Sequence, residues 1–268
     1  MEQPKNALLM PVVTIIAVVV AIILSFIGSG ALGGTPINEA AGGALSADAT
    51  PVAPDGPAFS IWSVIYAGLL GYAIYQLLPD NRTTARQTAL RPWAVLSALL
   101  NAGWILVVQA GSVVGSLAVI VVLLAVLVRL FILVLRIPPV SWIDALVSNG
   151  TFGLYLGWVC VATTANAAAL VASAGVGTFP GWQWATVGVL AIVVAVGIVI
   201  ALYSRGRIAP ALAIVWGLAW IAAARTSGDF ASPWVVWAAG VAAAAVGIAT
   251  LVFRLSTTRK RLSPTESA

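Results

Sequence analysis

Histidine is absent from this chain of 268 residues, and cysteine occurs once, as Cys160. A single cysteine excludes an intrachain disulfide, and without histidine or a Cys-x-x-Cys pair the sequence offers neither a zinc site nor a histidine-ligated haem. Histidine is also the commonest general base of enzymes. No paired carboxylates and no Ser/His or Cys/His pair replace it. The sequence therefore predicts a protein that is not an enzyme and requires no metal or cofactor.

Charged residues are also scarce, at 8% of the chain, whereas a soluble domain carries roughly a quarter. Hydrophobic residues make up 61% and form runs long enough to cross a bilayer. Because backbone groups in lipid must be paired within their own segment, such runs predict helices, and the alternating pattern of a β-barrel is absent. Composition thus predicts an all-α, multi-pass protein of the lipid bilayer. The net charge of +5 follows from membrane topology and predicts no nucleic-acid partner.

We expect eight membrane-spanning helices, over about residues 8–28, 58–78, 92–110, 113–135, 143–169, 184–203, 208–225 and 233–254. The cations test this count, because Lys and Arg gather in cytoplasmic loops. With both termini cytoplasmic, every Lys and Arg falls on the inner side except Arg225, which lies near Asp229. Residues 255–268 would then form a basic cytoplasmic tail.

Two segments each allow two interpretations. Residues 8–28 could be a cleaved signal peptide, but their apolar run is longer than the usual 7–15 residues, which favours a retained helix. The outer loop, residues 29–57, is rich in Gly, Ala and Pro and contains no Lys or Arg. It could be a flexible outer segment or a lid over a pocket that opens outward. Composition alone favours the flexible segment.

Three of the expected helices carry aromatic and polar residues on one face, at helical spacing. These stripes comprise Phe59, Trp62 and Tyr66; Ser97, Asn101 and Trp104; and Tyr155, Trp158, Ala162 and Asn166. Interfacial belts and interhelical hydrogen bonds could account for each residue singly. Trp104 and Trp158, however, lie well inside their spans, and polar groups at depth rarely face lipid. The stripes therefore predict either helix packing or a cavity shared by three helices.

These three segments, in this order, resemble the TspO/translocator-protein family, the tryptophan-rich sensory proteins. The segment FSIWSVIY (59–66) is similar to the start of the family's second helix, and LLNAGW (99–104) matches Leu-Asn-x-x-Trp. The most specific match is LYLGWVCVATTAN (154–166), which keeps the family's Tyr, Trp, Ala and Asn spacing. Leu154 and Val161 stand where the family has Pro and Phe. The resemblance covers roughly residues 8–170.

The resemblance implies a five-helix core over residues 1–170, with a three-helix extension over 171–254 and the tail over 255–268. It also implies a pocket near one membrane face, covered by the loop after the first helix, for tetrapyrroles such as protoporphyrin and haem. By this analogy Trp62, Asn101, Trp158 and Ala162 would line the pocket. The full set of candidate ligand-binding residues is Phe59, Trp62, Tyr66, Asn101, Trp104, Tyr155, Trp158, Ala162 and Asn166.

We therefore expect a binding or sensory protein for a hydrophobic, tetrapyrrole-like ligand, placed in a bacterial plasma membrane, with a homodimer as one assembly it could form. Two other functions stay open: an uncoupled carrier or exporter of a small apolar solute, and a membrane scaffold without a ligand. Degradation of a bound porphyrin also stays open, because the resemblance includes relatives with such activity. The lack of Asp, Glu, Lys or His near any bilayer midplane weighs against ion-coupled transport.

Overall fold

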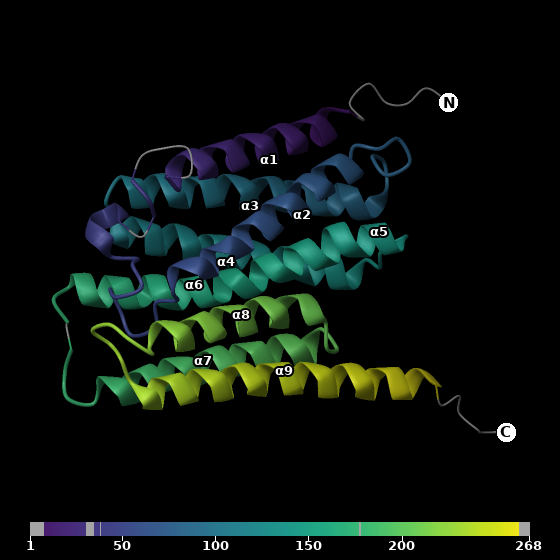
Figure 1. The fold of residues 1–268 in the computed structure, drawn as a ribbon. Coiled ribbons are helices and arrows are strands. Elements are labelled where there is room, and N and C mark those ends of the chain that lie inside the picture. Colours follow the sequence, from purple (N-terminus) through teal and green to yellow (C-terminus); the bar gives the residue numbers. More distant parts are fainter. Residues whose placement is uncertain (1–7, 31–34, 38, 177, 263–268) are drawn as a thin grey trace.

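A computed structural model describes residues 8–30, 35–37, 39–176 and 178–262 of the chain. Helices account for all regular secondary structure in these residues. They are α1 (Leu9–Gly28), η1 (Ala40–Gly43), η2 (Gly56–Ser60), α2 (Ile61–Tyr75), α3 (Ala85–Gln109), α4 (Val113–Arg136), α5 (Trp142–Asp144), η3 (Ala145–Gly150), α6 (Thr151–Ser173), α7 (Trp182–Tyr203), α8 (Ile208–Ala224) and α9 (Pro233–Leu262). The long helices run alongside one another, and α1 begins at the end of the bundle where α9 ends (Figure 1).

Each of the eight expected spans corresponds to a helix, which confirms the prediction of a polytopic all-α bundle. Within the described residues, seven helical segments are long and apolar enough to cross a membrane, and α8 is an apolar helix of 17 residues. The fifth span is one continuous helical stretch, Trp142–Ser173, interrupted by the π-helical turn η3. The last helix continues to Leu262, so the expected tail begins as helix, and residues 263–268 lie outside the described part of the chain.

One expected boundary is wrong: the third helix begins at Ala85 rather than near residue 92. The side chain of Thr84 accepts a hydrogen bond from the backbone N–H of Gln87 and caps the helix. The first two turns contain Arg86, Gln87 and Arg91, all of which are buried. Hydropathy alone could not assign these two turns to the membrane-spanning helix. Their polar side chains are buried only because they have partners on other segments.

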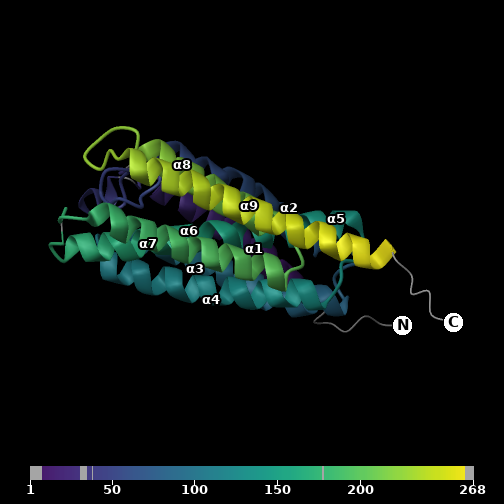
Figure 2. The ribbon, with the colours of Figure 1, turned by 90° about the horizontal axis from the view of Figure 1, so that it is seen from below.

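The bundle has two apolar cores that share α6. The first core joins α1, α2, α3, α4 and α6 and includes the fully buried Leu127, Phe152 and Trp158. The second joins α6 to α7, α8 and α9 through residues such as Ile214 and Val246. In both views α7, α8 and α9 form a neighbouring group beside α6 (Figures 1 and 2). The three C-terminal helices therefore pack directly on a helix that carries one of the aromatic stripes.

Small residues allow this close approach of α6 and α8. A Cβ atom added at Gly157 would lie 2.2 Å from the carbonyl oxygen of Pro210, and one at Gly153 would lie 2.8 Å from the Cβ of Ala209. In the opposite direction, a Cβ at Gly217 of α8 would lie 2.8 Å from the side chain of Val161. Close contact of this kind supplies dispersion energy that burial from water cannot supply within lipid.

We expect Gly157→Ala to lower the free energy of unfolding by about 1–3 kcal/mol, because the new methyl group must displace the backbone of α8. Thermal unfolding of the purified protein in detergent measures the effect. Gly188→Ala in α7 is the matched control, since no atom lies within 4 Å of its added Cβ. Alanine there should leave stability unchanged or raise it slightly. Equal melting of the two variants would contradict the close α6–α8 contact.

Buried polar side chains join the helices at the end of the bundle where the cations were expected. The Arg86 Nε atom lies 3.0 Å from Asp144 Oδ2, and these side chains are 2% and 0% exposed. Arg86 Nη2 also donates to Asn149 Oδ1, and Ser148 Oγ donates to Asp144 Oδ1 at 2.8 Å. Nearby, Arg91 Nε donates to Gln76 Oε1 at 2.6 Å. The expected spans leave both arginines in the cytoplasmic loop between residues 78 and 92, whereas both belong to α3 and bind neighbouring segments.

Candidate ligand-binding site

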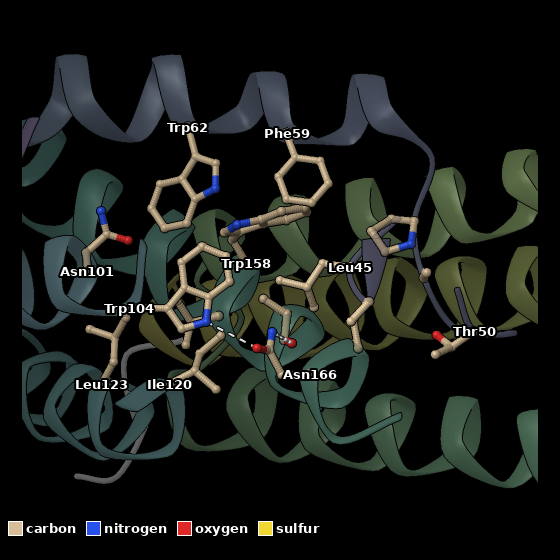
Figure 3. Close-up of a pocket in the computed structure, with 16 residues that line it drawn as sticks. Leu45, Thr50, Phe59, Trp62, Asn101, Trp104, Ile120, Leu123, Trp158 and Asn166 are labelled. Atoms are coloured by element: carbon tan, nitrogen blue, oxygen red, sulfur yellow. Dashed lines mark hydrogen bonds between the residues drawn. The ribbon is translucent and has the colours of Figure 1, made fainter. Parts of the chain in front are cut away.

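A small cavity lies between α2, α3, α4 and α6, at the end of the bundle opposite Asp144, and part of the outer loop covers it (Figure 3). Its volume is about 30 Å³, which is enough for roughly one water molecule. None of its 16 lining residues carries an ionisable side chain. The cavity can therefore recognise a molecule by shape and hydrogen bonding but offers no acid or base.

Most of the predicted ligand-binding residues come together here. Those that line the cavity are Phe59, Trp62, Asn101, Trp104, Trp158, Ala162 and Asn166. Tyr66 instead lines a second cavity, described below. Tyr155 lines neither cavity; it is fully buried, and its hydroxyl donates to the Ser97 carbonyl oxygen at 3.2 Å. The three stripes thus face one another across the bundle.

Aromatic rings form one wall of the cavity, with Trp62 at their centre. The Trp62 ring meets Trp158 edge-on, with centroids 6.4 Å apart, and stacks on Tyr66 at 5.3 Å. Phe59 also meets Trp158 edge-on, with ring centroids 5.8 Å apart. Tyr155 meets Trp62 edge-on, with ring centroids 5.6 Å apart. These geometries are the favourable ones for aromatic pairs. The rings therefore form one continuous aromatic wall in which most neighbours meet edge-on (Figure 3).

The two asparagines differ in how their hydrogen-bonding capacity is used. Asn166 Oδ1 accepts from Trp104 Nε1 and from Ser116 Oγ, both at 3.1 Å, and its amide donates to the Ala162 carbonyl. Asn166 is thereby satisfied within the protein. The amide of Asn101 donates to Tyr66 and Ser25, but its Oδ1 atom has no partner. Of the two asparagines, Asn101 is thus the one whose side-chain oxygen is available to accept a hydrogen bond from a ligand.

Three buried polar atoms without a hydrogen-bond partner belong to residues that line this cavity. They are Asn101 Oδ1, Trp158 Nε1 and Thr50 Oγ1. Leaving a buried polar group unpaired costs about 1–3 kcal/mol, so native proteins rarely do so without a reason. The residues around the cavity accordingly carry an unpaired acceptor, an unpaired donor and a hydroxyl that can act as either. A molecule with complementary groups would recover this free energy on binding.

A larger cavity of about 350 Å³ lies next to the first and shares Phe59, Trp62 and Trp104 with it. Residues of α1 and α2, among them Ser25 and Tyr66, complete its wall. The two indole rings and Phe59 therefore separate the enclosed cavity from the larger one. A change of side-chain rotamer at these shared residues would join the two volumes.

The outer loop covers the enclosed cavity and is held there by the C-terminal helices. Arg225 at the end of α8, 1% exposed, donates to the carbonyl oxygens of Ala47 and Thr50. The backbone N–H of Asp55 donates to the Trp220 carbonyl at 3.2 Å, and Trp216 Nε1 donates to the Ala58 carbonyl at 2.9 Å. The geometry of residues 39–57 thus favours a lid over a flexible segment. Residues 31–34 and 38 of the same loop lie outside the described part of the chain.

Sequence reasoning missed two contributions to the cavity. Ile120 and Leu123 of α4 lie across from the aromatic wall, and nothing distinguishes them from the other apolar residues of their helix. Leu45, Thr50 and Pro54 enter from the loop, where no periodicity exists to indicate an inward face. The only signal available was the length of the loop itself, because long ordered loops are often functional.

One of three comparisons with known proteins identifies a family for this chain. A family model described as TSPO-like protein matches residues 12–252, whereas no curated protein and no solved structure matches the chain. The match runs from α1 into α9. It therefore includes the three C-terminal helices, which the resemblance of the stripes alone did not reach. Since the match extends over well more than half of the chain, this membrane protein belongs to the TSPO-like protein family.

Proposed function

We propose that this protein binds a hydrophobic, planar ligand of the tetrapyrrole type in the cavity beneath the outer loop. The observation that carries the proposal is the group of unpartnered polar atoms, Asn101 Oδ1, Trp158 Nε1 and Thr50 Oγ1, at one aromatic cavity. An aromatic lining with a few directed polar groups suits a large apolar ring system. Membership of the TSPO-like family supports the same class of ligand.

The size of the cavity requires that the protein open before such a ligand enters. Small-molecule sites usually enclose about 300–1,000 Å³, far more than the 30 Å³ beneath the loop. The adjacent cavity of about 350 Å³ reaches that range. We propose that Phe59 and Trp62 turn aside and the loop lifts, so that the two cavities merge around the ligand. The described structure is then the closed state.

Metal-free protoporphyrin is the better probe, because a chain without histidine lacks the usual axial ligand of haem iron. We expect Trp158→Phe to weaken protoporphyrin IX binding about tenfold and Asn101→Ala about two- to tenfold, each through one lost hydrogen bond to the ligand. Tryptophan quenching of the detergent-purified protein measures the dissociation constants. Trp158 is 1% exposed in the first core, so the smaller ring also leaves a cavity, and the melting temperature is expected to fall and is measured beside the affinity.

Trp184→Phe is the matched control, since Trp184 is 76% exposed and lines neither cavity. It also removes one tryptophan, and its affinity should stay within twofold of the parent protein. Quenching that fails to saturate, or that is equal in all proteins, would mean partition of the dye into detergent and would reject the ligand proposal. Protoporphyrin flux across proteoliposomes, absent from a pure receptor, would instead identify a carrier.

A further inference from the structure

A second polar hollow lies at the opposite end of the bundle, where the cations were predicted to face the cytoplasm. It is a groove of about 640 Å³ between the C-terminal end of α4, the α7–α8 turn and α9. Arg136, Arg205 and Arg254 line it, together with Arg207. These residues come from three segments far apart in the sequence, so their convergence is a product of the fold.

The α7–α8 turn is built to sit tightly on α9. Arg205 and Gly206 both adopt the left-handed conformation, with φ of 57° and 74°, and the Gly206 N–H donates to the Ala201 carbonyl at 2.8 Å. A Cβ atom added at Gly206 would lie 2.4 Å from the backbone nitrogen of Arg254. Only glycine fits a turn this close to a neighbouring backbone at positive φ. The contact therefore fixes Arg205 beside Arg254.

The groove concentrates positive charge on three exposed arginines. None of its lining residues is acidic, and the side chains of Arg136, Arg205 and Arg254 are all exposed. Within the described ranges, the one ion pair is that of Arg86 with Asp144, two residues that do not line the groove. The hydroxyl group of Tyr203 adds a donor suited to anionic oxygens.

We propose that this groove binds a phosphate group, and that its position favours the headgroup phosphate of an anionic lipid in the inner leaflet. The guanidinium group matches phosphate oxygens in bidentate geometry, which lysine cannot do. Basic pockets between helices at the cytoplasmic surface are typical binding sites for anionic lipid headgroups. Leu135 and Pro138 add an apolar edge along which acyl chains can lie. The preference of Lys and Arg for the cytoplasmic side would explain arginines at this end of the bundle, but it would not require them to share one groove.

Native mass spectrometry of the full chain in detergent tests this site with phosphatidylglycerol, cardiolipin and phosphatidylcholine as probes. We expect the two anionic lipids to remain bound and the zwitterionic lipid to be lost. Arg205→Gln and Arg254→Gln should each weaken anionic-lipid binding about fivefold, and the double variant about 20-fold or more. Arg82→Gln is the matched control, because it removes the same charge from the same end of the bundle without lining the groove.

Calorimetric titration with inorganic pyrophosphate distinguishes a lipid from a soluble phosphate as the source. If pyrophosphate binds, both groove variants abolish its binding, and no lipid is selectively retained, then the groove is a phosphate site for a soluble ligand. Equal losses in Arg82→Gln and the groove variants, or no binding of either probe, would overturn the proposal. Every variant replaces an arginine outside the apolar cores, so near-native melting temperatures are expected and checked first.

Discussion

Replacing Arg225 with glutamine is expected to speed amide hydrogen exchange in the outer loop about 100-fold. Arg225 donates to the carbonyl oxygens of Ala47 and Thr50, and hydrogen bonds from charged donors contribute about 1.5–3 kcal/mol each. Losing both should favour the open loop by about 3 kcal/mol, or about two orders of magnitude in the opening equilibrium. The amides of Ala53 and Asp55, which are hydrogen-bonded in the closed loop, report the change by exchange mass spectrometry.

The same variant links the loop to ligand binding. If the loop covers the site, Arg225→Gln should also accelerate protoporphyrin association, because the open form is more populated. Arg205→Gln removes an arginine that lies in the basic groove on the opposite side and should leave loop exchange unchanged. Unaltered exchange at Ala53 in Arg225→Gln would show that the C-terminal helices do not hold the lid.

Asp144→Ala is expected to destabilise the protein by about 3–5 kcal/mol. The substitution leaves the guanidinium of Arg86 buried without its counter-charge, since both side chains are almost completely inaccessible, and an unpaired buried charge has this cost. Ser148, Gln87 and the backbone of Val140 would also lose the carboxylate as acceptor. Chemical or thermal unfolding in detergent measures the loss of stability. The matched control is Asp80, an exposed aspartate in the loop between α2 and α3.

Asp80→Ala should change stability by less than about 0.5 kcal/mol, as is usual for surface positions. The double variant Arg86→Met with Asp144→Leu separates charge from packing. Because it removes both charges, it should recover part of the stability that Asp144→Ala loses. If Asp144→Ala melts like Asp80→Ala, the buried ion pair contributes nothing and the inner ends of the helices are held by apolar packing alone.

These two expected results concern opposite ends of one bundle. At the inner end, buried charges join α3 to the stretch around η3. At the outer end, a buried arginine of α8 joins the C-terminal helices to the loop over the cavity. Helix α8 therefore contributes to the candidate site, although none of the residues of the three C-terminal helices lines the enclosed cavity. Their inclusion in the family match accords with this contribution.

The sequence by itself determined the class of the fold, because hydrophobic run length and the placement of Lys and Arg depend only on local chemistry and the bilayer. It also determined which faces of three helices carry aromatic and amide groups, since that follows from helical periodicity. The resemblance to TspO-like proteins rested on the same short-range spacing, at Asn101, Tyr155, Trp158 and Asn166.

Only the tertiary structure decided which of those groups are satisfied. Asn101 and Asn166 look alike in sequence, yet Ser116 and Trp104 take up the oxygen of Asn166 and leave that of Asn101 unpaired. The lid, the start of α3 and the basic groove depend on contacts between segments that are remote along the chain, such as Arg225 with Thr50. Pairings of this kind leave no signal in the local sequence. A polar residue in an apolar run can be buried only if the fold places a hydrogen-bonding or charged partner beside it. Helix packing determines which residue becomes that partner, and the local pattern of polar and apolar residues does not reveal it.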